Sequence, residues 1–152
     1  MLRDDINNAL KTAMKAGDAP RVSTLRLVNS SLKNADIEAR GQGKPPLSDE
    51  DALGVLQKMI KQRQESVELY EKGGRPELAA QEQAEIEIIS AYLPQQLSDI
   101  EAGSVIQAIV HEINAQTIKD MGRVMAALKE RYAGKLDFGK ASGAVKKILS
   151  GG

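Results

Sequence analysis

The spacing of the apolar residues constrains this chain most strongly, because apolar positions recur every three or four residues along its length. Leu2, Ile6, Ala9 and Ala13 illustrate the stripe, which is typical of one buried helix face. No long run alternates polar and apolar residues in the manner of a half-buried strand. Ala, Leu, Glu, Lys and Gln, which favour helices, are abundant. The sequence therefore predicts an all-α fold.

Capping residues and helix breakers divide this pattern into seven segments. Gly17 stops the first segment, and Asp18 is placed as the N-cap of the second. Ser98 and Glu101 have the spacing of a capping box, in which each side chain bonds the other residue's backbone N–H. Ile37 is expected to face inward from the second helix. The predicted helices cover about residues 2–16, 19–40, 49–72, 76–93, 99–114, 118–132 and 138–150.

A break in the helical pattern over residues 93–98, which contains Pro94, predicts a domain boundary near residue 95. Helices expected before the break include the longest of the chain, whereas the three expected after it are short. We therefore predict a long-helix N-terminal domain over residues 1–95 and a small three-helix C-terminal domain over residues 96–152.

The composition excludes most of the conventional catalytic and metal-binding groups of enzymes. The chain has no cysteine and one histidine, which excludes disulfides, thiol nucleophiles and metal sites built from cysteines or from two histidines of one chain. His111-Glu112 matches the start of a zinc-binding His-Glu-x-x-His motif, but position 115 is alanine. The residues therefore predict no metal, no cofactor, no catalytic residue and no intrinsic activity.

The sequence shows no signal for secretion or for membrane insertion. The first residues are not followed by the apolar run of a signal peptide, and no stretch of about 18 apolar residues is present to span a bilayer. We therefore expect a cytoplasmic protein without a membrane partner.

The formal net charge is zero, but the charges are unevenly distributed along the chain. Residues 1–47 carry +3, residues 48–118 carry −8 and residues 119–152 carry +5. The last segment holds eight basic and three acidic residues, so it can bind a nucleic-acid backbone by displacing counterions. With three tyrosines and one phenylalanine in the whole chain, a platform that stacks several bases is not expected.

Three stretches resemble the GatB/YqeY family, whose members are similar to the tail of the B subunit of aspartyl/glutamyl-tRNA amidotransferase. They are residues 24–40, residues 58–70 together with 85–94, and residues 119–125 followed by 134–137 and 145–149. The resemblance implies a helical tail that contacts tRNA. On matching positions it assigns the RNA contacts to Lys119, Arg123, Lys129 and Lys135, with Lys146 and Lys147 behind them.

The resemblance implies a non-catalytic accessory protein linked to tRNA-dependent amidation, the synthesis of Gln-tRNA and Asn-tRNA. The expected partners are tRNA and either amidotransferase subunits or an aminoacyl-tRNA synthetase. A protein-interaction adaptor without RNA binding, using the acidic segment 48–118 and the long helices, is the alternative. A third interpretation transfers the family-level activity of a carbon–nitrogen ligase with glutamine as amido donor, which no residue here supports.

Overall fold

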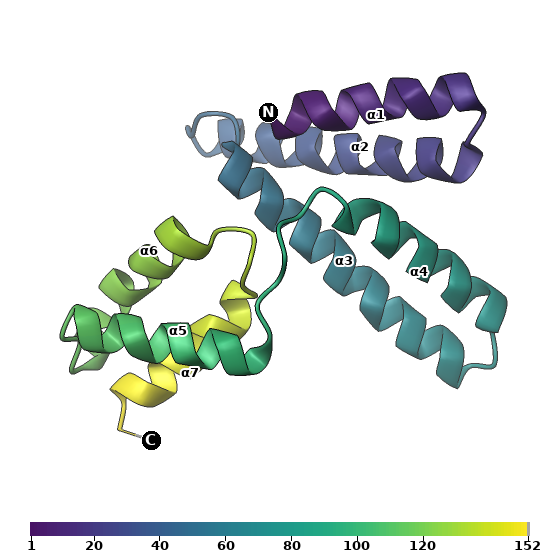
Figure 1. The fold of residues 1–152 in the computed structure, drawn as a ribbon. Helices are drawn as coiled ribbons and strands as arrows, with labels where there is room; N and C mark the ends of the chain where they lie inside the picture. Colours follow the sequence, from purple (N-terminus) through teal and green to yellow (C-terminus); the bar gives the residue numbers. More distant parts are fainter. Residues whose placement is uncertain (152) are drawn as a thin grey trace. The chain divides into compact units, whose positions relative to one another are not determined.

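The computed structural model describes residues 1–151, and within that range it contains seven α-helices, one short 3-10 helix and no strand. The all-α prediction is confirmed. The chain forms two compact units, Met1–Leu93 and Pro94–Gly152, called here the N-terminal unit and the C-terminal unit (Figure 1). That each unit is an independently folding domain stays a prediction.

The N-terminal unit is built from two pairs of adjacent helices. The first pair is α1 (Leu2–Ala16) and α2 (Ala19–Gly41), and the second is α3 (Asp49–Lys72) and α4 (Pro76–Ser90), as Figure 1 shows. All four helices contribute to one apolar core. Its fully or almost fully buried members are Ile6, Leu25, Val28, Leu32, Ala52, Leu56, Met59 and Ile89.

The predicted helix boundaries are close to the observed ones in this unit, with one exception. The fourth helix ends at Ser90 rather than at residue 93, because the chain turns before Pro94, and proline disfavours helical geometry in the residue before it. Ile37 was expected to be inward-facing, and that prediction is wrong, since 63% of its surface is exposed. The apolar stripe of α2 continues to Ala39, which is buried, and Ile37 lies outside this stripe.

The C-terminal unit packs three short helices around a second apolar core. Its elements are α5 (Asp99–Glu112), the 3-10 helix η1 (Ile118–Asp120), α6 (Met121–Tyr132) and α7 (Phe138–Leu149). The buried core residues come from all three α-helices and the adjoining loops. They are Ile106, Ile109, Ala115, Val124, Leu128, Leu136, Ala141, Val145 and Leu149.

Two local features shorten the predicted helices of this unit. The fifth helix ends at Glu112 rather than at residue 114, because Asn114 adopts a left-handed conformation with φ of 55°. The N–H groups of Asn114 and Ala115 then bond the carbonyls of His111 and Val110 and close the helix. The segment predicted as one helix over 118–132 is η1 followed by α6.

Candidate nucleic-acid interface

The six lysine and arginine residues predicted to contact RNA all lie in the C-terminal unit, but on different elements. Lys119 is in η1, Arg123 and Lys129 are on α6, Lys135 is in the turn between α6 and α7, and Lys146 and Lys147 are in the last turn of α7. Lys135 is half-buried, whereas the other five residues are exposed.

Three of these lysines lie at one end of the unit. Ile148, in the last turn of α7, lines the same shallow hollow as His111 and Asn114 at the end of α5. The loop that follows α5 leads directly into η1, and η1 packs against α7. We call the exposed side chains of Lys119, Lys146 and Lys147 at this end the basic end. Among residues 1–151, none of the three has an ion-pair partner.

Lys135 lies at the opposite end of α7 from Lys146. Lys135 precedes the start of α7 at Phe138, and Lys146 lies eight residues, or about 12 Å, further along the helix axis. The turn that carries Lys135 is held by the N–H of Leu97, which donates to the Lys135 carbonyl at 2.9 Å. The side-chain amide of Gln96 also donates to the carbonyl of Gly134. Lys135 is therefore fixed in a turn apart from the basic end.

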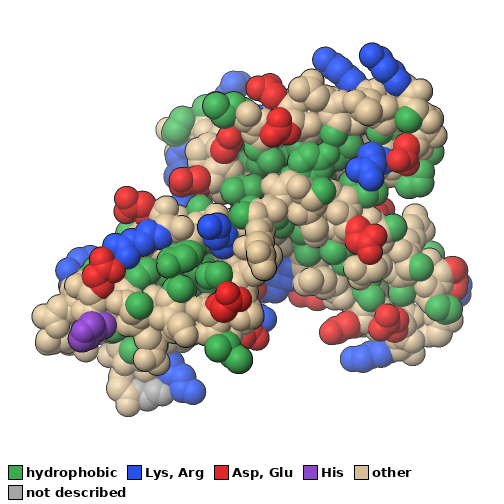
Figure 2. All heavy atoms as spheres, in the orientation of Figure 1, with side chains coloured by type: hydrophobic (Ala, Val, Ile, Leu, Met, Phe, Trp, Pro, Cys, Tyr) green, Lys and Arg blue, Asp and Glu red, His purple; other side chains and the backbone are tan. Residues whose placement is uncertain are grey.

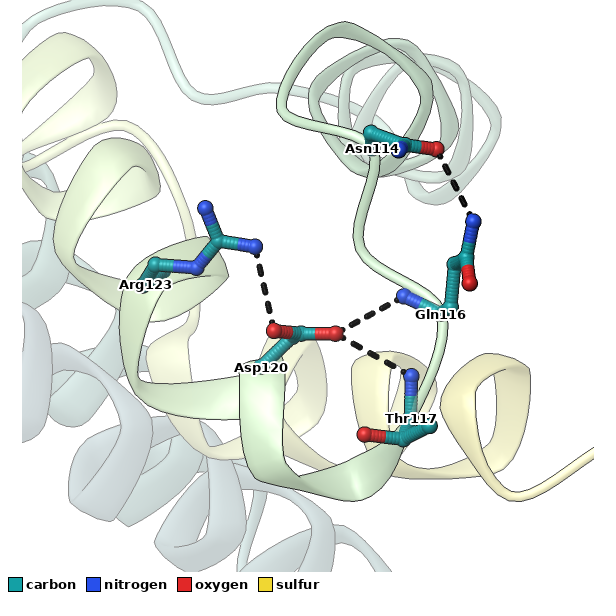
Figure 3. Close-up of polar contacts among 5 residues, drawn as sticks. All are labelled: Asn114, Gln116, Thr117, Asp120 and Arg123. Atoms are coloured by element: carbon teal, nitrogen blue, oxygen red, sulfur yellow. Dashed lines mark hydrogen bonds and ion pairs between the residues drawn. The ribbon is translucent and has the colours of Figure 1, made fainter.

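Arg123 is tied to a neighbouring carboxylate. Its guanidinium donates to Asp120 Oδ1 at 3.0 Å, while Oδ2 accepts hydrogen bonds from the N–H groups of Gln116 and Thr117 at 2.9 and 3.2 Å (Figure 3). These backbone N–H groups, and then Arg123, lower the pKa of Asp120. The pairing of Asp120 with Arg123 was not predicted from the sequence. Part of the Arg123 charge is consequently neutralised inside the protein.

A second ion pair, between Glu112 at the end of α5 and Arg131 near the end of α6, was missed by sequence reasoning. The two terminal guanidinium nitrogens of Arg131, Nη1 and Nη2, donate to the carboxylate oxygens of Glu112, at 2.7 and 2.9 Å. These hydrogen bonds lower the pKa of Glu112 and raise that of Arg131. The two residues are 19 positions apart in the sequence, so no local sequence pattern predicts the pair.

The basic and acidic side chains are interspersed on the face drawn in Figure 2, so the pairing of individual charges decides which cations are available. Within residues 1–151, no three His, Asp or Glu side chains are placed to hold a metal ion. His111 is exposed near the end of α5. In the same residues no helix is both long and apolar enough to cross a membrane.

The chain is an all-helical protein whose C-terminal unit consists of short helices. A family model described as Yqey-like protein matches residues 3–149, and the chain belongs to this family. The GatB/YqeY resemblance is thereby confirmed.

The chain is similar to several fungal proteins. A Lachancea thermotolerans protein named Altered inheritance of mitochondria protein 41, mitochondrial, is 41% identical over 92 residues, 60% of this chain and 47% of that protein. A Pyrenophora tritici-repentis protein of the same name is 27% identical over 127 residues, 80% of this chain and 68% of that protein. An uncharacterised Schizosaccharomyces pombe protein is 33% identical over 95 residues, 62% of this chain and 74% of that protein. The match spans about half the length of the L. thermotolerans and Eremothecium gossypii relatives.

The relatives overturn the prediction of a cytoplasmic protein. The L. thermotolerans, E. gossypii and P. tritici-repentis proteins all carry the word mitochondrial in their names. The prediction rested on the composition and on the expectation of no secretion signal, and neither of these identifies a compartment. A folded helical protein meets water in more than one compartment, so these properties do not distinguish the cytoplasm from another aqueous compartment.

Proposed function

We propose that this protein is a non-catalytic accessory protein that contacts the phosphate backbone of RNA, tRNA in particular, through the basic end. The observation that carries the proposal is the position of Lys119, Lys146 and Lys147 at one end of the C-terminal unit, exposed and without ion-pair partners among the described residues. Each lysine is a compact, mobile positive charge that reaches a phosphate without a fixed geometry. Such contacts position RNA and carry no base specificity.

The aromatic residues of this unit support backbone contact rather than base stacking. Tyr132 and Phe138 are partly buried and pack against the apolar core, so their ring faces contribute to folding. A stacking platform needs aromatic faces presented to the nucleic acid. Binding through phosphates alone is therefore the mode that the available side chains favour.

The family resemblance connects this RNA contact to tRNA-dependent amidation. The basic end lies in the segment that resembles the tail of the amidotransferase B subunit, which implies the same class of ligand. We propose tRNA as the RNA partner, and amidotransferase subunits or an aminoacyl-tRNA synthetase as the proteins that act on it. An accessory protein of this kind needs affinity for tRNA but no catalytic site of its own.

Fluorescence anisotropy with labelled tRNA, over a series of salt concentrations, tests the proposal. The variant Lys119→Ala/Lys146→Ala/Lys147→Ala removes the basic end. The matched control, Lys11→Ala/Lys15→Ala/Lys33→Ala, removes three exposed lysines from the N-terminal unit and the same amount of charge. Each phosphate contact contributes about 0.7–0.9 to the slope of log K against log salt, so the first variant should reduce the slope by about two.

If the proposal is right, the slope falls in the basic-end variant and changes much less in the control. An unchanged slope in the basic-end variant, or an equal reduction in both variants, would contradict it. Arg123→Ala sharpens the assignment, because Asp120 already holds the Arg123 guanidinium. We expect this change to weaken binding less than Lys119→Ala does.

Co-purification with amidotransferase subunits tests the proposed link between RNA binding and tRNA-dependent amidation. We expect tRNA to connect the two proteins, so nuclease treatment should release the amidotransferase from the immobilised protein. Capture that survives nuclease and is unaffected by the basic-end variant would instead favour an adaptor that binds protein directly.

A further inference from the structure

The outer surface of the α1–α2 pair carries apolar side chains that its own core does not use. Met14 and Leu27 are 52% and 44% exposed, and Val22 between them is half-buried. These residues line a shallow groove along the N-terminal half of α2, to which α1 contributes Met14. Its lining includes Met14, Val22, Ser23, Arg26, Leu27 and Ser30.

The segment that carries this groove is strongly basic. Residues 6–35 hold five basic residues and one acidic residue, and that acid, Asp18, is already paired with Arg21 at 3.3 Å. Arg26 lines the groove, and Lys33 lies seven residues further along the same helix and so near the same face. Among the described residues, Arg26 and Lys33 have no ion-pair partner.

We propose that this groove binds an acidic amphipathic helix of a partner protein. The spacing of Ser23, Leu27 and Ser30 along α2 leaves a ridge against which a partner helix can place apolar residues at i, i+3 and i+7. Arg26 and Lys33 complement carboxylates on the partner's edges, which steers association and excludes basic partners. A nucleic acid would pair with the charges but would leave Met14 and Leu27 exposed to water.

A second copy of this chain is a poorer fit for the groove. The helices with a net negative charge are α3, α4 and α5, and the exposed positions in the middle of α4 are polar or small, as at Gln81, Gln83 and Glu87. On α3 and α5, Leu69 and Ile100 are each the single large apolar residue of the helix that is exposed. None of these helices therefore presents an acidic face with an apolar ridge. The partner is therefore a different protein, and this surface is independent of the basic end.

The probe is a synthetic acidic peptide of about 18 residues, long enough to form a helix when bound. Its leucines occupy i, i+3, i+7 and i+10, and glutamates flank them; a scrambled peptide of equal composition distributes the leucines around the helix. Amide chemical shifts of the whole ¹⁵N-labelled protein should change around Met14, Val22, Leu27 and Ser30. We expect the patterned peptide to bind about tenfold more tightly than the scrambled one, the signature of specific apolar contacts.

Two double variants decide the assignment. Arg26→Glu/Leu27→Ser changes the groove and should weaken the patterned peptide about tenfold or more. Leu69→Ser/Lys72→Glu makes the same two changes at an exposed place on α3 and should alter binding less than about twofold. Circular dichroism checks that both variants stay folded.

Four results would overturn this inference. Equal binding of the two peptides would mean attraction by charge alone, and shifts confined to other helices would place the site elsewhere. Concentration-dependent self-association that Arg26→Glu/Leu27→Ser abolishes would make a second copy the occupant. The same double variant should leave the salt dependence of tRNA binding unchanged, because the basic end is untouched; a changed dependence would make the groove an RNA surface. Failure of the basic-end variant, by contrast, would leave the peptide result standing.

Discussion

The N-terminal unit builds its core from helices of 15 to 24 residues, whereas the α-helices of the C-terminal unit have 12 to 14 residues. Both units have an ion pair between helices, such as Arg63 on α3 with Glu85 on α4 at 2.9 Å in the N-terminal unit. The difference lies in capping. In the N-terminal unit, α1 and α4 begin without a hydrogen bond to the N-cap side chain, whereas in the C-terminal unit Ser98 and Asp120 accept hydrogen bonds from backbone N–H groups at the starts of α5 and η1.

Helix length explains this contrast. Each helix end leaves four backbone groups without partners, whatever the length of the helix, so short helices have proportionally more of them. Asp137 caps the start of α7, where its side chain accepts hydrogen bonds from the N–H groups of Gly139 and Lys140. Long helices instead offer extended sides on which apolar packing and paired charges accumulate. Substitutions should therefore affect the two units through different groups.

The largest expected effect comes from the two cores, which share no residue. Leu128→Ala, in the C-terminal core, should reduce stability by about 2–5 kcal/mol because it leaves a cavity. Leu56→Ala is the matched change in the N-terminal core. Native-state hydrogen exchange should show faster exchange confined to the unit that carries the substitution. Loss of protection in both units from either change would mean that they fold as one domain.

Breaking an ion pair should cost more in the N-terminal unit. The side chains of Arg63 and Glu85 are 15% and 20% exposed, so Arg63→Met leaves a poorly hydrated carboxylate and should cost about 1–3 kcal/mol. Arg131 and Glu112 are 45% and 55% exposed, and Arg131→Met should have a much smaller effect. Urea denaturation compares the two variants, and equal losses would refute the explanation by burial.

Acid should destabilise the C-terminal unit first. Hydrogen bonds from the Ser98 backbone, from Arg131 and from the Gln116 backbone lower the pKa of Glu101, Glu112 and Asp120, respectively. A lowered folded-state pKa stabilises the fold fully above the ordinary values of 3.8–4.5, and this contribution is lost as pH falls through the folded values. In the N-terminal unit, the Leu47 N–H lowers the pKa of Asp36.

Amide spectra recorded from about pH 5.5 downwards measure this difference. Signals of the C-terminal unit should lose their folded positions at a higher pH than those of the N-terminal unit. Glu112→Gln should reduce the pH dependence of the C-terminal unit without removing it. Loss of both sets of signals at one pH would show that these carboxylates do not set the order.

The smallest effect is expected at Gly122, in the first turn of α6. A Cβ added there meets no atom of its surroundings within 4 Å, so Gly122→Ala should stabilise the helix by about 0.5–1 kcal/mol. Thermal denaturation measures the gain. If tRNA lies against the helix start at this point, the same change weakens binding; contact through the basic end alone leaves the affinity unchanged.

The sequence predicted the helices well because their signals are local. Gly17, Asp18 and Ser98 act within a few residues, and the structure places each at the predicted helix end. Errors arose where a single backbone conformation decides the result. The left-handed Asn114 ends α5 early, although asparagine there has no unique signature in the sequence.

The candidate interface was only partly predictable, for a physical reason. Sequence identifies which residues are basic, but not which carboxylates lie beside them in the fold. Asp120 holds Arg123 at a separation of three residues, which helical spacing allows, whereas Glu112 and Arg131 meet only after α5 and α6 pack together. Likewise, nothing in the chain order shows that η1 packs against α7, and this contact defines the basic end.

The most direct test of the account is to map tRNA contacts by amide chemical shifts on the whole labelled protein. Charge alone does not choose between the two units, since residues 6–35 carry +4 and residues 119–152 carry +5. The account predicts that the shifts gather at η1 and the last turn of α7, around Lys119, Lys146 and Lys147. Shifts that gather on α1 and α2 instead, or that are spread evenly over both units, would contradict it.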